Sequence, residues 1–373
     1  MSYLDRVRTE LAVLSAKQRR RVARNSVPAG AIDFASNDYL GLARDERVLA
    51  ALRGATAAGS GGSRLLGGAA REYTQLEAAL AEWTGRERAL LFSSGYLAAI
   101  GAITALAPCV SGAYSDALVH ACIIDGLRLT KLERHIVPHA TLPDRPAAPR
   151  GALIVTESAF GMDGSRAPLA AHVADLRPDD VLLIDEAHAL GVAGLHGAGY
   201  AAGCGDERIV VIGTLSKALG AAGGFVAGPA EVIELLTSTA RSFIFDTAMP
   251  PAIAAAAARA LGIVRDDEGD ALRARLDARA ERVRGELREL GYDVQGDAGP
   301  IVPLVLGSES AALRLARALE ARGVYAPAVR PPTVPPGACR LRLSVRANHT
   351  EAEIGILMQA LRELRPADLV ATD

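Results

Sequence analysis

The chain has 373 residues, half of them hydrophobic, with a formal net charge of −2 at pH 7. This composition excludes intrinsic disorder as the main state, and the length predicts more than one domain. The near balance of 41 basic and 43 acidic residues favours neither nucleic acid nor an anionic membrane as a partner. The cysteines at positions 109, 122, 204 and 339 form no CxxC pair, so we expect reduced thiols in a cytoplasmic protein and no structural zinc.

The first 45 residues predict a helix followed by a short strand. Leu4, Val7, Leu11 and Leu14 recur at helical spacing, and charged residues between them argue against a secretory signal. A strand-like piece covers residues 32–42. A glycine-rich loop follows over 59–68, and then a helix is expected from residue 73 to about 83.

From residue 89 onward, short apolar runs alternate with helical stretches. The runs are rich in Leu, Val and Ile without polar alternation, as is typical of strands that are covered on both faces. They are ALLF (89–92), ALIV (152–155), VLLI (181–184), IVVI (209–212) and FVAG (225–228). The alternation predicts an α/β layer with a mainly parallel sheet. The uncharged stretch 89–115 is long enough to span a bilayer, but turn residues interrupt it, so we expect a buried strand and a core helix.

Beyond a break at residues 249–251, the pattern predicts a smaller α+β domain. Apolar residues from 272 to 290 follow one face of a long helix that Gly291 ends. Strands over 301–306 and 340–345 then alternate with helices over 309–322 and 350–364. We therefore predict an N-terminal segment (1–45), a large α/β domain (46–255) and a small C-terminal α+β domain (256–373).

Two apolar runs are followed by polar residues with chemical potential. Asp185 directly follows VLLI, with His188 three residues further on, and Lys217 lies five residues after IVVI among small residues. In open α/β sheets, ligands gather at the carboxyl ends of the strands. The 32 residues between Asp185 and Lys217 correspond to about one strand–helix–strand unit, which places both at one sheet edge. Taken singly, Asp185 could equally cap a helix, and Lys217 could extend to water.

Together these residues suggest pyridoxal phosphate, a cofactor that needs a lysine for a Schiff base and an acid beside its pyridine nitrogen. In SSGY (93–96) a strand gives way to a turn and a helix, so the N–H groups of Gly95 and Tyr96 can face a phosphate. Walker A, GxSxG and HExxH motifs are absent from the sequence, and no GxGxxG opens a helix after a strand. We therefore disfavour a dinucleotide oxidoreductase, a serine hydrolase and a zinc hydrolase.

Six motifs make the chain resemble the α-oxoamine synthases. They are SNDYLGL (36–42), GSGGSRL (59–65), LLFSSGY (90–96), VTESAFGMDG (155–164), DEAHALG (185–191) and GTLSKALG (213–220). The resemblance implies a fold-type I, aspartate aminotransferase-like pyridoxal 5′-phosphate enzyme that condenses an amino acid with an acyl thioester and releases carbon dioxide. The stretch RPPTVPPGACRLRLSV (330–345) most resembles the biotin-pathway branch, which uses L-alanine and pimeloyl-CoA or pimeloyl-acyl carrier protein. The alternatives are the branches that use glycine with acetyl or succinyl thioesters, or serine with a long-chain thioester.

The resemblance also assigns roles to residues in the matching positions. Lys217 would hold the cofactor and move the Cα proton, Asp185 would pair with the pyridine nitrogen, and His188 would hydrogen-bond the phenolic oxygen. His120 matches a histidine that stacks on the ring. The phosphate would be held by Gly95, Tyr96 and Thr214, joined by Thr247 of a second subunit, and the substrate site would be lined by Arg19, Asn37, Glu157, Thr333 and Arg342. Arg342 would bind the substrate carboxylate as a bidentate fork.

Three positions depart from the family pattern. Cys122 and Gly161 each stand where a serine is usual, and Tyr73 stands where a histidine is usual. Loss of the hydroxyl at Gly161 requires that its contact come from backbone, water or Ser158. The departures affect the substrate details and leave the core chemistry in place. The resemblance further implies a cytoplasmic homodimer.

Overall fold

The computed structural model describes residues 1–21, 27–146, 149–296 and 299–364. The chain divides into two compact units, one of Met1–Ser36, Met162–Gly164 and Asp277–Asp373, and a larger one of Asn37–Gly161 and Ser165–Leu276. These divisions fall at other residues than the borders predicted after 45 and 255, and the three predicted parts stay a prediction. The two units are described separately below.

The larger unit is built on a seven-stranded sheet with the order β2-β8-β7-β6-β5-β3-β4. The strands are β2 (Arg88–Phe92), β3 (Gly112–Asp116), β4 (Glu133–Val137), β5 (Ala152–Glu157), β6 (Val181–Asp185), β7 (Ile209–Thr214) and β8 (Gly224–Gly228). The pairs β3–β4, β3–β5, β5–β6 and β6–β7 are parallel, whereas β8 is antiparallel to both β2 and β7. The predicted α/β fold with a mainly parallel sheet is confirmed.

All five apolar runs form strands, and two further strands were not predicted. The predicted strands are buried because neighbours cover both faces, which is why their sequences lack alternation. Within the described part of the chain, strand β4 pairs only with β3 at the sheet edge, and most of its side chains reach the surface. Because this edge strand is exposed to solvent, it does not need an apolar run. Its sequence, ERHIV, therefore gives no strong strand signal.

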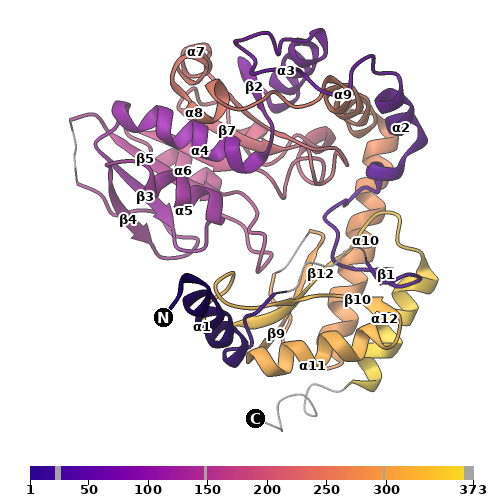
Figure 1. Ribbon diagram of the computed structural model, residues 1–373. Helices are drawn as coiled ribbons and strands as arrows, with labels where there is room; N and C mark the ends of the chain where they lie inside the picture. The colour runs from indigo at the N-terminus through magenta and orange to yellow at the C-terminus, as the bar shows by residue number, and fades with distance from the viewer. Residues whose placement is uncertain (22–26, 147–148, 297–298, 365–373) are drawn as a thin grey trace. The chain divides into compact units, whose positions relative to one another are not determined.

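The larger unit also contains helices, some of which pack on the sheet. They are α2 (Glu46–Arg53), α3 (Arg71–Thr84), α4 (Gly95–Leu106), α5 (Ala121–Arg128), α6 (Leu169–Asp175), α7 (Ala230–Thr239), α8 (Arg241–Ile244), α9 (Pro251–Arg265) and the first part of α10 (Asp267–Glu289), with short 3₁₀ turns at Leu42–Arg44 and Ala107–Cys109. Helix α4 contacts β7 and β8, and Figure 1 shows α4 and α5 lying across the strands. The uncharged stretch 89–115 thus contains the expected buried strand and core helix, followed by most of strand β3, which was not predicted. Among the described residues no helix is long and apolar enough to cross a membrane.

The connection between β6 and β7 differs from the prediction. It contains two 3₁₀ turns, Leu195–Gly197 and Ala201–Gly203, in place of the expected helix. Gly194 and Gly199 have φ angles of +76° and +86°, and a Cβ on Gly194 would lie 2.2 Å from the Gly199 carbonyl oxygen. A tight glycine turn therefore replaces the helix. The strand expected over 32–42 is likewise only β1 (Ile32–Asp33), and the rest of that segment turns.

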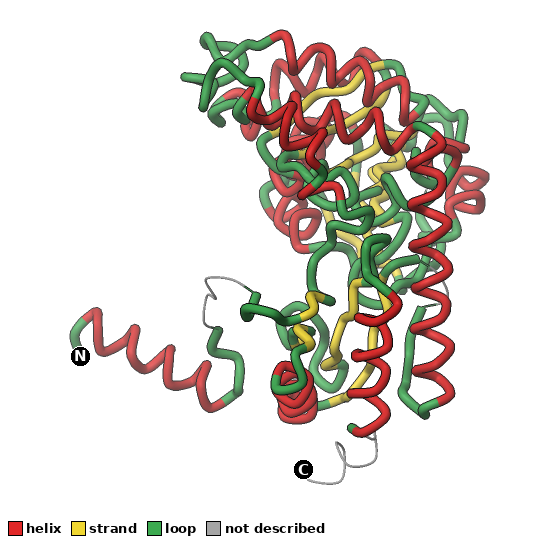
Figure 2. Tube along the Cα trace, turned by 90° about the vertical axis from the view of Figure 1, so that its right-hand side faces the viewer, coloured by secondary structure: helices red, strands yellow, loops and turns green. Residues whose placement is uncertain are grey.

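The smaller unit contains a three-stranded antiparallel sheet and a two-stranded parallel pair. The sheet has the order β11-β12-β9, with β9 (Ile301–Gly307), β11 (Ala328–Val329) and β12 (Cys339–Ser344), and β1 pairs with β10 (Val324–Tyr325). Its helices are α1 (Tyr3–Ala16), the end of α10, α11 (Glu309–Glu320) and α12 (Glu351–Glu363), close to the predicted ranges. Helix α1, at the N-terminus in Figure 2, buries none of its residues. Its predicted apolar stripe is therefore exposed.

Candidate active site

A pocket of about 270 Å³ opens where strands β5, β6 and β7 end. The sequence-predicted residues that line it are Gly95, Tyr96, His120, Glu157, Asp185, His188, Thr214 and Lys217, together with Ser94, Cys122, Ala187, Ile212, Gly213 and Ser216. The carboxyl ends of parallel strands meet at one edge, and this brings together residues that are far apart in sequence. The expectation that Asp185 and Lys217 share an edge is confirmed.

Two carboxyl groups lie side by side at the strand ends. Glu157 on β5 and Asp185 on β6 are register partners, and both are buried. The Glu157 carboxyl accepts from the N–H groups of His120 (2.6 Å) and Gly161 (3.3 Å), and Asp185 Oδ1 accepts from Ala187 N–H (2.9 Å). Burial and the neighbouring charge of Asp185 raise the pKa of Glu157 to about 8. Glu157 is therefore protonated near neutral pH, and this edge of the sheet carries one negative charge fewer.

The raised pKa of Glu157 predicts a pH-dependent stability. A carboxyl whose pKa rises from 4.5 to about 8 on folding binds more protons in the folded state between these values. The free energy of unfolding should therefore fall as pH rises from about 5 to 8, by an amount on the order of a few kcal/mol. We expect Glu157→Gln to remove much of this slope, measured by urea denaturation of the cofactor-free protein at pH 5, 6.5 and 8.

Two other glutamates define the controls for this measurement. Part of the slope should remain in Glu157→Gln, because burial also raises the pKa of Glu186, to about 7. Glu133, whose side chain is 79% exposed, offers the matched control Glu133→Gln, which should keep the wild-type slope. An unchanged slope in Glu157→Gln would contradict the assigned proton.

Lys217 is hydrogen-bonded to an ordered set of side chains. Its Nζ lies 2.9 Å from His188 Nε2, and His188 Nδ1 lies 2.7 Å from the Tyr39 hydroxyl oxygen. The Tyr39 hydroxyl donates to Asn37 Oδ1 at 3.2 Å. Asn37 was predicted from the motif SNDYLGL, but Tyr39 was not. Its only sequence signal was its place in that motif.

The departure at Gly161 has a direct structural consequence. A Cβ built on Gly161 would lie 2.4 Å from His188 Nε2, so a larger residue here would require the imidazole to shift. The glycine therefore leaves room for the imidazole in the orientation that reaches Lys217. Ser158, the alternative hydroxyl considered above, is buried and is not among the residues that line the pocket.

The other end of the pocket has the features of an anion site. Helix α4 begins at Gly95, and its N-cap residue Ser94 accepts from Leu97 N–H through its hydroxyl and from Ala98 N–H through its carbonyl. The N–H groups of Gly95 and Tyr96 thus lie at the positive end of the helix. The Thr214 hydroxyl is 2.8 Å from that of Ser216. An amine, a carboxylate and an anion cradle in one pocket fit pyridoxal phosphate.

His120 caps helix α5 through its ring nitrogen Nδ1. Its Nδ1 accepts from Cys122 N–H at 3.2 Å and lies 3.0 Å from Cys122 Sγ. Burial lowers the pKa of the imidazole although part of the residue reaches the surface. The neutral ring therefore carries its proton on Nε2. Burial also raises the pKa of the Cys122 thiol, so it remains protonated.

Two further residues discussed from the sequence lie at a separate small hollow. Thr247 and Tyr73 line it together with Ser93 and Asp246. Tyr73 is fully buried, and its hydroxyl donates to the Met249 carbonyl. Thr247 is exposed and does not line the Lys217 pocket of its own chain. Its predicted role in a second subunit stays a prediction.

The remaining predicted substrate residues belong to the smaller unit. Arg342 on β12 is buried, and its Nη1 donates to Ser344 Oγ at 3.0 Å. Arg19 forms an ion pair with Glu309 at 3.1 Å. Thr333 is exposed, and its N–H donates to the Arg330 carbonyl. Their roles toward the substrate stay predictions.

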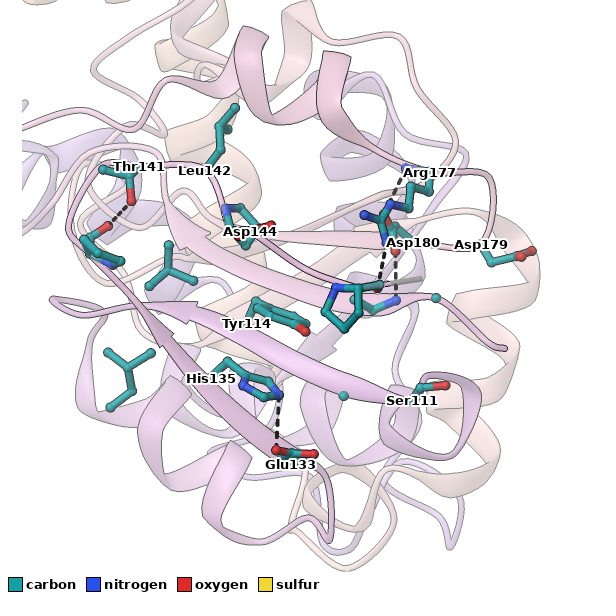
Figure 3. Close-up of a pocket in the computed structure, with 18 of the residues that line it drawn as sticks. Ser111, Tyr114, Glu133, His135, Thr141, Leu142, Asp144, Arg177, Asp179 and Asp180 are labelled. Atoms are coloured by element: carbon teal, nitrogen blue, oxygen red, sulfur yellow. Dashed lines mark hydrogen bonds and ion pairs between the residues drawn. The ribbon is translucent and has the colours of Figure 1, made fainter. Parts of the chain in front are cut away.

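A larger pocket of about 890 Å³ lies at the β3–β4 edge of the sheet. Figure 3 shows Tyr114 and His135 side by side, with ring centroids 4.6 Å apart, and Glu133 paired with His135. The Asp180 carboxylate is held by Arg145 at 2.7 Å and by two backbone N–H groups. None of the predicted site residues lines this pocket, so its size alone does not make it the active site.

Comparison with known proteins identifies the family. The sequence profile described as aminotransferase class I and II matches residues 29–361. The chain is also 44% identical to 8-amino-7-oxononanoate synthase of Burkholderia cenocepacia, over 98% of this chain and 97% of that protein. This chain belongs to the aminotransferase class I and II family. Within that family it is an α-oxoamine synthase, which confirms the resemblance.

Solved structures of similar proteins agree with this assignment. Serine palmitoyltransferase from Sphingomonas wittichii superposes with a TM-score of 0.88 at 29% identity, covering 99% of this chain and 98% of that one. A structure described as SPT with its PLP internal aldimine superposes with a TM-score of 0.86 at 28% identity, with both chains fully covered. For 8-amino-7-oxononanoate synthase from Francisella tularensis, the TM-score is 0.74 at 27% identity, with 90% and 97% covered. The predicted fold-type I architecture is confirmed.

Proposed function

We propose that this chain is an 8-amino-7-oxononanoate synthase, a pyridoxal-phosphate-dependent acyltransferase of biotin biosynthesis. It condenses L-alanine with a pimeloyl thioester and produces 8-amino-7-oxononanoate, carbon dioxide and a free thiol. The observation that carries this proposal is the 44% identity to proteins of that name over nearly the full length of both chains. The pocket around Lys217 supports it, because its donor set fits the cofactor that this chemistry needs.

Different residues of the pocket would bind different parts of pyridoxal phosphate. The bound cofactor supplies an electron sink that stabilises a carbanion at the amino acid Cα. Lys217 would hold it covalently, and Asp185 would pair with its ring nitrogen. The phosphate would lie against the N–H groups of Gly95 and Tyr96 and the hydroxyl of Thr214.

The chain's own residues would then position the substrate and move one proton. Lys217 Nζ takes the Cα proton and later returns it, with His188 in contact at 2.9 Å. Arg342 binds the substrate carboxylate through two parallel N–H donors, which fixes the orientation of the Cα–H bond. His120 presents a neutral ring with its donor at Nε2. We also assign Asn37, Arg19 and Thr333 to substrate binding, as the resemblance implies.

We also infer a homodimer, with the cytoplasm as its location. Two features support the dimer. Thr247 lies outside the pocket of its own chain, and helix α1 leaves apolar side chains such as Leu4 (57% exposed) uncovered. The free cysteines are compatible with a reducing compartment.

Another α-oxoamine synthase activity is the second candidate. Serine palmitoyltransferase has the higher TM-score, 0.88 against 0.74 for the Francisella tularensis synthase. Sequence identity favours the biotin branch, because the serine-using enzyme is only 29% identical while the curated synthase is 44% identical.

A thiol-release assay separates these candidates. Alanine, glycine and serine would each be combined with acetyl, succinyl, pimeloyl and palmitoyl thioesters. We expect alanine with a pimeloyl thioester to give a kcat/KM at least about 10-fold above any other pair, as one well-matched pocket contact can supply. A preference for glycine with a short acyl group, or for serine with a long one, would overturn the proposal.

A further inference from the structure

Tyr39 is a fully buried phenol between two polar residues of the active site. Its hydroxyl is hydrogen-bonded to Asn37 on one side and to His188 on the other, at 3.2 and 2.7 Å. His188 in turn contacts Lys217 Nζ through its second ring nitrogen, at 2.9 Å. These four side chains lie in one compact unit and form a continuous hydrogen-bonded chain that ends at the reactive amine.

The hydrogen bonds in this chain run in one direction. Tyr39 has a single hydroxyl proton, which it donates to Asn37 Oδ1, an atom that can only accept. The Tyr39 oxygen must then accept from His188, so the neutral imidazole carries its proton on Nδ1. The lone pair of His188 Nε2 is left facing the amine of Lys217.

The position of the His188 ring is also fixed sterically. His188 is 8% exposed, and the backbone of Gly161 approaches its ring so closely that a Cβ there would lie 2.4 Å from Nε2. The Tyr39 ring contacts it from another side, with centroids 6.1 Å apart. The imidazole therefore has little freedom to turn its other edge toward Lys217.

We propose that Tyr39 is a positioning residue that holds His188 in the Nδ1–H tautomer, so that His188 Nε2 accepts a hydrogen bond from the Lys217 ammonium group and fixes the position of Nζ. The proton stays on Nζ, because the ordinary pKa of a lysine is about 10.4 and that of a histidine about 6.5. The hydrogen bond holds the amine in one position, from which it can react once it loses its proton. The catalytic consequence rests on the proposed function, whereas the hydrogen-bonded chain is a property of the cofactor-free protein.

The test uses the Tyr39→Phe variant and nuclear magnetic resonance of the cofactor-free protein. The chain has only three lysines, so ¹³C-dimethylated lysines resolve Lys217 from the exposed Lys17 and Lys131, which serve as internal references. Removal of the Tyr39 hydroxyl should lower the titration midpoint of Lys217 by about one pH unit, because the Nε2–H tautomer can no longer accept from the ammonium group. In ¹⁵N spectra, His188 should change from the Nδ1–H tautomer to a mixture. The loaded variant should lose about 10-fold in kcat at every pH tested and keep its KM for alanine.

The other titratable groups that face this part of the pocket stay in place in Tyr39→Phe. They are Tyr96, His120, Cys122, Glu157 and Asp185. Tyr114→Phe is the matched control, because Tyr114 is a nearly buried tyrosine of the same unit that lines the other pocket. It should leave both the Lys217 midpoint and the His188 spectrum unchanged.

A second variant keeps the proposal testable if Tyr39→Phe folds poorly. Asn37→Ala removes the acceptor of the Tyr39 proton, so the hydroxyl can donate to His188 Nδ1 and the imidazole should switch to the Nε2–H tautomer. A wild-type His188 that carries its proton on Nε2, or a folded Tyr39→Phe protein with an unchanged Lys217 midpoint, would overturn the proposal. A failed assignment of substrates would appear only in the thiol-release assay and would leave these spectra unaffected.

Discussion

Replacement of Lys217 by alanine is expected to reduce the rate of thiol release by on the order of 10⁴-fold or more, because one amine serves as both covalent anchor and base. Arginine cannot replace it, since its guanidinium remains protonated and does not form the required bond. The pocket itself should persist, because the contacts of Glu157 and Asp185 with backbone N–H groups do not involve Lys217.

Mass spectrometry provides a second measurement of the Lys217 prediction. Borohydride reduction of the wild-type protein loaded with pyridoxal phosphate should add one pyridoxyl group to the peptide that contains Lys217, and none in Lys217→Ala. Lys131→Ala, at an exposed lysine of the same unit, should behave as wild type. A label on Lys17 or Lys131 would refute the assignment.

Asp185→Asn should reduce kcat by about 100-fold or more with little loss of structure. The amide oxygen of asparagine can still accept from Ala187 N–H, as Asp185 Oδ1 does at 2.9 Å, so the strand end keeps its local geometry. The variant lacks the negative charge that would keep the ring nitrogen of the cofactor protonated. The absorbance spectrum and the dissociation constant of the cofactor should both change.

The neighbouring carboxyl group offers an independent check of the Asp185 prediction. Part of the raised pKa of Glu157 comes from the charge of Asp185, so in Asp185→Asn the pKa of Glu157 should fall below about 8. The decrease in stability with pH should then end at a lower pH than in the wild type. Asp179→Asn, at an exposed carboxylate of the same unit, is the control and should match the wild type in rate and stability. Wild-type activity in Asp185→Asn would exclude the assigned role.

Strands were predicted correctly where they are buried, because a buried strand has an apolar sequence. Strands β5, β6 and β7 are covered on both faces, so each reads as an apolar run. At the sheet edge, β4 is exposed to solvent on one side. Its sequence therefore mixes polar and apolar residues and resembles that of a loop. The helix predicted between β6 and β7 was wrong. The length of this connection suits a helix, but its close glycine contacts do not.

Asp185 and Lys217 each follow an apolar run, and the ends of parallel strands meet at one edge of a sheet. This was enough to place both residues at that edge, and together with the motifs it suggested the cofactor. The sequence alone could not predict three features of the site. They are the proton on Glu157, the space that Gly161 leaves for His188, and the role of Tyr39. Each depends on distances of a few ångströms between segments far apart in the chain, such as Tyr39 and His188. Protonation states and tautomers follow from those contacts, because burial and hydrogen-bond direction are properties of the folded pocket.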